Sequence, residues 1–452
     1  MTKMRNSVET YLNVFAIDQA RPLECASLAG IDQVIVIPAL AERDYLFHTL
    51  ASLSGNPQED INRSLVICVV NNRRNPLTDA ISIEDNQETL HLLRMLIKGS
   101  LPDARFMGGI NGKDLRIALD SGLRIACIDA SSRGCELPDR AGGVGMARKI
   151  GMDAAVRLLS RETVGLKLIL CLDADTEVDP NYLPAVRAFF EDQRAKAAVV
   201  LFTHRMPSDP NDCAAICCYE IFLRYYVLGL HYARSPYAFH AVGSTIVCTI
   251  DGYVSVRGMT IRDAAEDFYF LNKLAKIDAI RDIITTRVYP SARLSSRVPF
   301  GTGRRIIRYL GGQRDEYLLY APEIFHLLFL WLNDVNENSD CDGYEIESRA
   351  RDIHPLITSF LRRVHFAETW QRVRKNCRSS DQLKRQFMTW FDAFKTLKFI
   401  NHLTKEGITP VDMFAASKRL LFMMGRECPL EIKSGIVPPI ADQRFLIDLL
   451  NP

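Results

Sequence analysis

The sequence predicts an α/β fold in which a mostly parallel sheet is followed by an α-helical C-terminal region. Short apolar, β-branched runs recur through the first 250 residues, and segments of helical length and pattern separate them. This alternation is typical of parallel sheets with crossover helices. No convincing strand pattern follows about residue 310, and the amphipathic segments there predict the helical region.

The individual elements follow from these patterns. Strands are expected at residues 33–37, 65–70, 124–128, 167–172, 198–203 and 245–250. Crossover helices are expected at residues 43–53, 84–97, 145–160 and 181–192, the last after the start signal Asp179-Pro180, and a long helix from 210 to about 234. The C-terminal patterns predict helices at 316–332, 348–364, 382–400 and 411–424, with a polar loop at 336–343.

Length and composition set the domain organisation. A chain of 452 residues exceeds one ordinary core, because domains hold about 100–200 residues. We expect an N-terminal extension at 1–30, an α/β domain at 31–310 and a helical region at 311–452. Hydrophobic residues make up 48% and charged residues 24%, as in globular proteins.

Charge and hydropathy argue against several classes of partner. A net charge of +2 creates no long-range field for nucleic acid, so we expect no nucleic-acid partner. Residues 1–19 lack the apolar core of an export signal, so we expect a cytoplasmic protein. The most apolar window, 324–332, is shorter than the about 20 residues of a membrane-spanning helix, so we expect no integral membrane segment.

The strongest chemical signal is a pair of carboxylates after an apolar run. Residues 168–172 should form a strand, and Asp173 and Asp175 should stand at its C-terminal end, where α/β sheets collect ligands. Two oxygen ligands suit Mn²⁺ or Mg²⁺, which also bind water and substrate phosphates. The alternative is an Asp-rich turn that caps the next helix, a role that Asp179 fits better.

Asp173-Ala174-Asp175 resembles the Asp-x-Asp motif of GT-A glycosyltransferases, whose sheet is Rossmann-like, and its surroundings resemble family 2 of that group. The resemblance covers about residues 31–303 and implies a metal-dependent transferase that uses a nucleotide-diphosphate sugar. Asp173 and Asp175 would hold Mn²⁺ or Mg²⁺, and Asp173 would also contact the donor. The acceptor class stays open among saccharides, lipid-linked molecules and small molecules.

Three segments resemble the donor half of family 2. Residues 34–42 resemble its first strand and nucleotide-binding turn, which implies donor contacts from Pro38, Leu40 and Glu42. Residues 66–72 resemble its second strand, which implies that Asn71 meets the base, although many members carry Asp there. Residues 143–151 resemble its glycine-rich turn into a helix.

Basic residues in two of these segments suit a diphosphate. Arg148 and Lys149 follow the glycine-rich turn, and a helix N-terminus there favours phosphate, although such residues are more often solvated surface. Residues 293–303 resemble a loop that closes over the donor, in which Arg297 would contact phosphate. An ordinary loop between domains is the alternative for that segment.

Residues 239–245 and 258–268 resemble the acceptor half of family 2, in which a Glu-Asp pair supplies the catalytic base. The resemblance implies that Glu266 and Asp267 are catalytic, with Asp267 as the base of an inverting transfer. Alternatively, both are first-turn acids that the helix dipole favours. His204, His231 and His240 are candidates for a further metal ligand, although isolated histidines are usually structural.

Three rival interpretations remain. The Asp173–Thr176 segment partly resembles the nucleophile motif of haloacid-dehalogenase phosphohydrolases, but Thr176 comes one position early and no later strand ends in paired acids. A nucleotidyltransferase fits less well, because no glycine-rich, arginine-containing loop follows the first strand. A non-catalytic nucleotide-sugar-binding protein stays open.

Overall fold

The computed structural model describes residues 2–17, 21–101, 111–161, 165–293, 302–312, 315–432 and 435–451, which form two compact units. The first unit consists mainly of Met1–Arg205 and Ala241–Ser291, and the second mainly of Met206–His240 and Gly301–Pro452. These units differ from the expected ranges, because residues 1–30 join the first unit and residues 206–240 join the second. The reason is packing: buried side chains of 217–238 belong to the C-terminal hydrophobic core.

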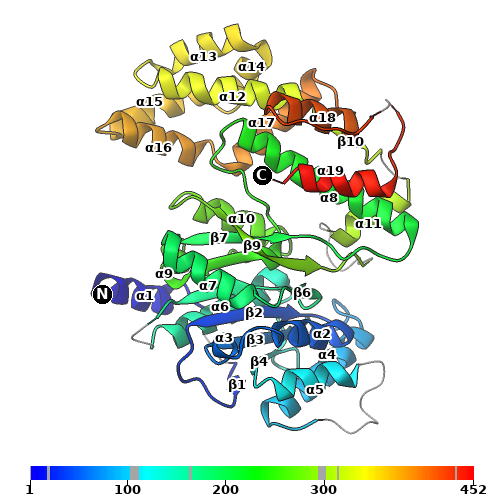
Figure 1. Ribbon diagram of the computed structural model, residues 1–452. Helices are drawn as coiled ribbons and strands as arrows, with labels where there is room; N and C mark the ends of the chain where they lie inside the picture. Colours follow the sequence, from blue (N-terminus) through cyan, green and yellow to red (C-terminus); the bar gives the residue numbers. More distant parts are fainter. Residues whose placement is uncertain are drawn as a thin grey trace. The chain divides into compact units, whose positions relative to one another are not determined.

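The first unit contains a nine-stranded sheet in the order β1-β4-β3-β2-β5-β8-β7-β9-β6. Figure 1 labels β1, β2, β3, β4, β6, β7 and β9 of this sheet. The centre of the sheet is parallel, as predicted, and every residue of β2 and β3 is buried, as expected for strands covered on both faces. The predicted strands are β2 (Gln33–Ala39), β3 (Ser64–Asn71), β4 (Arg124–Ala130), β5 (Leu168–Cys171), β7 (Ala197–Phe202) and β8 (Ile246–Thr249).

Three strands of this sheet were not predicted: β1 (Leu23–Cys25), β6 (Thr176–Val178) and β9 (Arg281–Pro290). β1 and β6 have three residues each, too few for a periodic signal. β9 is longer but carries exposed and polar residues between its buried ones. β8 pairs antiparallel with both β5 and β7, so the sheet is mixed on this side.

The predicted helices of the first unit are α2 (Arg43–Leu53), α4 (Ala80–Ile97), α6 (Val144–Leu159) and α7 (Tyr182–Gln193). α4 begins four residues earlier than predicted because the Asp79 side chain accepts a hydrogen bond from the Ser82 amide. Asp179 does not cap α7; its carboxylate accepts a hydrogen bond from the Tyr289 hydroxyl at 2.9 Å. The remaining helices are α1 (Thr2–Val14), α3 (Gln58–Ile61), α5 (Gly112–Asp120), α9 (Ile250–Ser255) and α10 (Glu266–Leu274).

The second unit is largely helical, as predicted. It contains α8 (Pro210–Tyr232), α11 (Thr302–Leu310), α12 (Pro322–Glu337), α13 (Gly343–Ile353), α14 (Pro355–Arg363), α15 (Phe366–Asn376), α16 (Ser380–Trp390), α17 (Ala393–Glu406), α18 (Met413–Met423) and α19 (Ile440–Leu449). A small antiparallel pair, β10 (Leu318–Leu319) and β11 (Val411–Asp412), was not expected in this region.

Two of the predicted C-terminal helices are wrong, because each is broken in the structure. The segment 348–364 divides between α13 and α14 at Pro355, which lacks the amide hydrogen that a helix interior needs. The segment 382–400 divides between α16 and α17, where the Asp392 side chain accepts a hydrogen bond from the Lys395 amide and starts a new helix. Apolar periodicity alone did not reveal either break.

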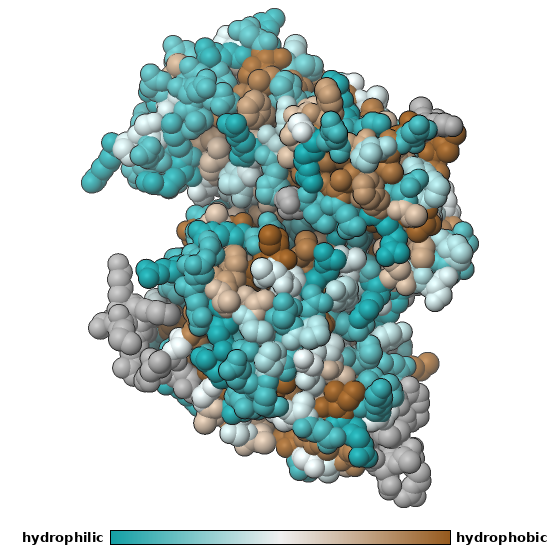
Figure 2. Space-filling view, in the orientation of Figure 1, coloured by the Kyte–Doolittle hydropathy of each residue, from teal (hydrophilic) through white to brown (hydrophobic). Residues whose placement is uncertain are grey.

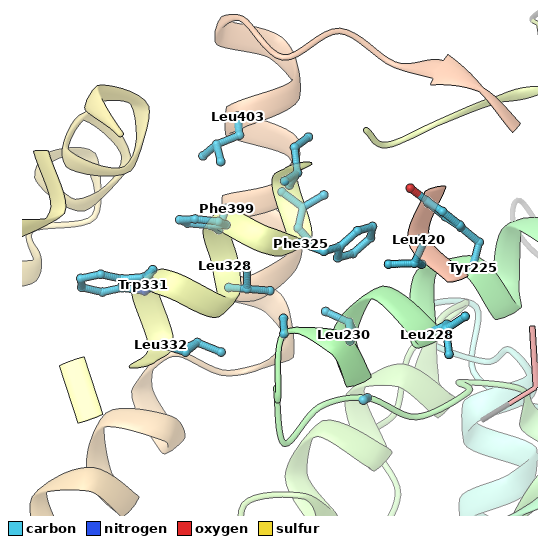
Figure 3. Packing of buried hydrophobic residues seen from close by; sticks show 14 of the residues in the cluster. Tyr225, Leu228, Leu230, Phe325, Leu328, Trp331, Leu332, Phe399, Leu403 and Leu420 are labelled. Atoms are coloured by element: carbon cyan, nitrogen blue, oxygen red, sulfur yellow. The ribbon is translucent and has the colours of Figure 1, made fainter. Parts of the chain in front are cut away.

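The core of the second unit joins α8, α12, α17 and α18 (Figure 3). Phe325, Leu328 and Trp331 of α12 lie among Leu228, Leu230, Phe399, Leu403 and Leu420. Gly229 allows α8 to approach α12 closely, because a Cβ there would lie 2.6 Å from ring atoms of Phe325. Among the described residues, one helix is long and apolar enough to cross a membrane, and it is α8 rather than the segment 324–332. However, 67% of the 18-residue apolar window within α8 is buried inside the protein.

Candidate functional site

Asp173 and Asp175 lie at the carboxyl end of β5, as predicted. Cys171 pairs with Val36 of β2, so Asp173 stands level with Pro38 at the sheet edge where ligands collect. Two hydrogen bonds hold the turn: the Thr49 hydroxyl donates to the Ala174 carbonyl at 2.9 Å, and the Thr176 amide donates to the Asp173 carbonyl at 3.2 Å. Both aspartates keep partial access to solvent.

Arg148 connects this strand end to α10. Arg148 is 4% exposed, and its guanidinium group donates hydrogen bonds to the Asp173 carboxylate and to the Glu266 carboxylate. Glu266 is the first residue of α10 and is buried, whereas Asp267 is half-buried. The Asp-x-Asp turn and the Glu266–Asp267 pair, 91 residues apart in sequence, therefore share one buried cation.

The surroundings of this cluster raise the pKa of both Arg148 and Asp267. Burial alone lowers the pKa of Arg148, but the Asp173 and Glu266 carboxylates outweigh it, so the net shift of that pKa is upward. Burial first, and the Glu266 carboxylate second, raise the pKa of Asp267 to about 7. A carboxylate with a pKa near neutral is suited to take a proton from a hydroxyl group.

The glycines around Arg148 have a packing role that the sequence did not reveal. A Cβ at Gly145 would lie 2.6 Å from the Arg262 carbonyl and 3.1 Å from the Glu266 Cβ, so the start of α6 fits directly against the segment that leads into α10. A Cβ at Gly243 would overlap the Arg148 guanidinium. At these two positions, the absence of a side chain allows other groups of the protein to pack closely, and not only a ligand to approach.

Lys149 does not face this cluster, which corrects its expected place in the donor site. Its ammonium group is buried, lies 3.0 Å from the Asp153 carboxylate and donates to the Tyr11 hydroxyl at 2.8 Å. Tyr253 also donates to Asp153, at 2.8 Å. No sequence pattern reveals this network, because α1, α6 and α9 each supply only one or two of its residues.

The expected donor contacts from β2 and β3 gather at the same sheet edge. Pro38 is buried within β2, Leu40 follows the strand, and Glu42 is the N-terminal cap position of α2. Asn71 ends β3, and its carbonyl accepts a hydrogen bond from the Asn86 amide group at 3.0 Å.

Asn86 was missed from the sequence although it organises this edge. Its side-chain nitrogen also donates to the Asn72 side-chain oxygen at 2.9 Å, and its oxygen accepts from the Ala41 amide at 2.8 Å. It thereby fixes the turn after β2 against the end of β3. A polar residue in the apolar pattern of α4 was the signal that could have identified it.

Four other candidate site residues remain, namely Arg297 and the three histidines. Arg297 lies outside the described residues. His231 and His240 belong to the second unit, and His204 is buried against Phe202 in the first. Across the described parts of the chain, no group of three His, Cys, Asp or Glu side chains is arranged to hold a metal ion, so a histidine as further ligand has no support.

A separate cavity of about 390 Å³ lies in the first unit. Met146 and Ile150 of α6 line it together with Arg21, Arg74 and the segment 136–139. None of the candidate carboxylates lines it, so this cavity does not coincide with the Arg148 cluster.

Comparisons with known proteins give the following results. A scan against protein-family models found no match, and a search of curated proteins found none. Among solved structures, S. aureus TarS 1–349 in complex with UDP-GlcNAc is similar with 14% identity and a TM-score of 0.34, over 92% of this chain and 91% of that one. Mannosyltransferase PcManGT from Pyrobaculum calidifontis in complex with GDP-Man and Mn²⁺ is similar with 11% identity and a TM-score of 0.34, over 90% and 94%. At these TM-scores the likeness assigns neither a family nor a function to this chain.

Proposed function

We propose that this chain is a glycosyltransferase of the GT-A type, similar to family 2, that moves a sugar from a nucleotide diphosphate to an acceptor hydroxyl with inversion. The observation that carries the proposal is the Arg148 cluster, in which a strand-end Asp-x-Asp turn and a Glu-Asp pair meet around one guanidinium. Sugar transfer needs both parts, one for the departing diphosphate and one for the acceptor proton. We propose the cytoplasm as its compartment.

The residues at the strand end fit a divalent metal ion of the hard class. The donor atoms are carboxylate oxygens, and the Asp173 side chain is 35% exposed with only one oxygen bonded to Arg148. Two protein carboxylates suit Mn²⁺ or Mg²⁺, which take their other ligands from water and phosphate. Asp175 and Asp173 would hold the ion, which when bound stabilises negative charge on the diphosphate.

The other residues of the cluster have distinct tasks in this proposal. Asp267 accepts the proton of the acceptor hydroxyl, for which its raised pKa suits it. Arg148 fixes the orientation of Asp173 and Glu266 rather than binding phosphate itself, since both of its terminal nitrogens already donate to protein carboxylates. Pro38, Leu40, Glu42 and Asn71 form the donor side at the ends of β2 and β3.

The decisive experiment measures nucleotide binding with and without metal. We expect UDP or GDP to bind the whole chain in the presence of Mn²⁺, and chelation to remove most of that affinity. Asp175→Asn should abolish the metal-dependent part, because one of two protein ligands is lost. The matched control is Asp192→Asn, an exposed aspartate on α7, which should bind as the parent does.

Two results would contradict the proposed role of Asp173 and Asp175, and a third would contradict the proposed catalytic activity. One is equal metal-dependent affinity in Asp175→Asn and the parent chain. The other is a stable beryllium fluoride adduct on Asp173, which would instead identify a phosphohydrolase that uses Asp173 as nucleophile. Binding without any sugar transfer, across UDP- and GDP-sugars and a panel of acceptors, would favour the non-catalytic alternative.

A further inference from the structure

A short part of the second unit is strongly basic although the whole chain is nearly neutral. Between residues 362 and 385 the sequence has eight Lys and Arg residues but only two acidic ones, Glu368 and Asp381. The chain as a whole has a net charge of +2. Seven of the eight cations belong to the end of α14 and to α15 and α16, which follow one another in the helical unit, and Arg378 lies between α15 and α16 (Figure 1).

Most of these cations are exposed, and most have no acidic side chain within 4.0 Å in the part of the chain that the structure describes. We define the basic surface as six exposed residues: Arg362, Arg363, Arg372, Lys375, Arg378 and Arg385. Among the described residues, only Arg362 of these six has an acidic side chain within 4.0 Å, that of Glu347, although Glu368 and Asp381 stand four residues before Arg372 and Arg385 on the same helices. Arg374 differs, because it donates to the carbonyls of Cys341 and Asp340 and so has a structural role.

Helix stability accounts for only part of the basic surface. Arg362, Arg363 and Lys375 lie in the last turns of α14 and α15, where cations interact favourably with the helix dipole. Arg378 lies between helices and Arg385 in the middle of α16, where the dipole gives no such benefit. Glu368 and Asp381 offset two of the eight positive charges, and the remaining excess of positive charge on this segment is unfavourable unless an anion binds.

The same segment lacks the features that a membrane or nucleic-acid bases would use. Large hydrophobic side chains are exposed at Tyr344 and at Phe422, but at no described position between them. Surface helices that bind membranes combine cations with exposed apolar residues, and base recognition uses exposed aromatic rings. The rings of Phe366, Trp370 and Phe387 instead pack against one another. Figure 2 likewise shows a mainly hydrophilic surface over α13 to α16.

We propose that the basic surface binds a soluble linear polyanion that carries a phosphate group on each repeating unit. α15 alone is about 16 Å long at 1.5 Å per residue, so several phosphates of one flexible polymer can contact cations at once. Arg residues suit phosphate because the guanidinium can donate two hydrogen bonds to it. This inference does not depend on the proposed sugar transfer.

The experiment uses the whole chain and long-chain inorganic polyphosphate, with affinity measured over a series of salt concentrations. We expect the affinity to fall with salt, by a log–log slope of about 0.7 for each phosphate contact if the polymer behaves as a single strand does. The variant Arg372→Gln/Lys375→Gln/Arg385→Gln should weaken binding at least tenfold and reduce that slope by about 2. The control Lys113→Gln/Arg116→Gln/Arg444→Gln removes three exposed cations elsewhere and should keep both values.

Several outcomes would overturn the proposal. Equal losses in the two triple variants would indicate a general charge effect rather than a site. Tighter binding to phosphatidylserine vesicles than to polyphosphate would identify a membrane surface instead. Preference for single-stranded RNA over polyphosphate of similar charge would identify base recognition. Circular dichroism melting of both variants checks that each is folded.

Discussion

Arg148 shows how one residue can connect two parts of a site that are far apart in sequence. Its guanidinium is buried, so its charge is tolerated only because Asp173 and Glu266 accept its hydrogen bonds. Gly243 provides the space for the guanidinium group. Arg148 therefore contributes to the site through the two carboxylates that it binds as much as through its own charge.

We expect Arg148→Met to destabilise the protein by about 3–5 kcal/mol, because the change leaves Glu266 buried without its cation. Urea unfolding measures the loss. The matched control is Arg349→Met: Arg349 pairs with Asp334 but its side chain is 48% exposed, and exposed ion pairs contribute about 0–1 kcal/mol. Similar losses in the two variants would contradict the role of burial in the Arg148 cluster.

Asp267 should control the pH dependence of the proposed transfer. A base must be ionised to act, and the pKa of Asp267 is raised to about 7, so the rate should increase about tenfold per pH unit below that value and level off above it. Asp267→Asn should lower kcat by about 10²–10⁴-fold and leave donor binding nearly unchanged. Steady-state kinetics between pH 5 and 9 separate these effects.

The stability of the Asp267→Asn variant provides an independent check. Because the folded-state pKa is above the ordinary value of about 4, the protonated carboxyl favours folding at low pH, and this contribution is lost as the pH rises through about 7. The variant should therefore be no less stable than the parent at pH 8. Lost activity together with a large loss of stability at that pH would point to a structural role.

At the scale of elements, α6 is the helix on which both buried networks converge. One side of it carries Arg148, and another carries Lys149 and Asp153, which bond to Tyr11 of α1 and, through Asp153, to Tyr253 of α9. The Ile17 amide also donates to Asp153 at 2.8 Å, and Arg157 donates to the Ile17 carbonyl at 2.9 Å. The N-terminal segment thus holds α6 from outside the sheet.

We expect Tyr11→Phe to cost about 1–3 kcal/mol of unfolding free energy, because a completely buried carboxylate loses a hydrogen-bond donor. Tyr253 donates to the same oxygen of Asp153, so the Tyr11→Phe/Tyr253→Phe pair should deviate from additivity by more than about 0.5 kcal/mol. Chemical denaturation of both single variants and the double variant measures this coupling. Tyr344→Phe, at a residue 57% exposed on α13, is the control that should change little.

At the scale of the whole molecule, different spectroscopic signals follow the unfolding of the two compact units. All three tryptophans, Trp331, Trp370 and Trp390, belong to the second unit, and the proposed nucleotide site belongs to the first. Fluorescence of these tryptophans therefore reports unfolding of the helical unit alone. Far-ultraviolet circular dichroism reports both units.

We expect Mn²⁺ with UDP or GDP to shift the circular dichroism melting curve upward while the tryptophan transition stays in place. A ligand at about 100 times its dissociation constant stabilises the unit that binds it by about 2.7 kcal/mol. The physical reason is that each unit has a buried core of its own and can unfold separately. Equal shifts of both signals would show that the two units unfold as one.

The sequence by itself determined the central strands, the main crossover helices and the position of Asp173 and Asp175. Those features depend on local information: β2, β3 and β5 are buried along their whole length, and their composition records that burial. The helical character of the C-terminal region also follows from local information, because apolar residues recur there with the period of a helix. The breaks at Pro355 and Asp392 depended on local signals as well, but periodicity outweighed them in our prediction.

Only the tertiary structure decided which of the candidate site residues lie together. Arg148 and Lys149 are neighbours with similar charge, yet one faces Asp173 and Glu266 and the other faces Asp153, because a helix turns successive side chains by about 100°. The assignment of α8 to the helical unit rests on contacts with α12 and α19, which lie far along the chain. Such contacts carry no local pattern, since each depends on where distant segments pack.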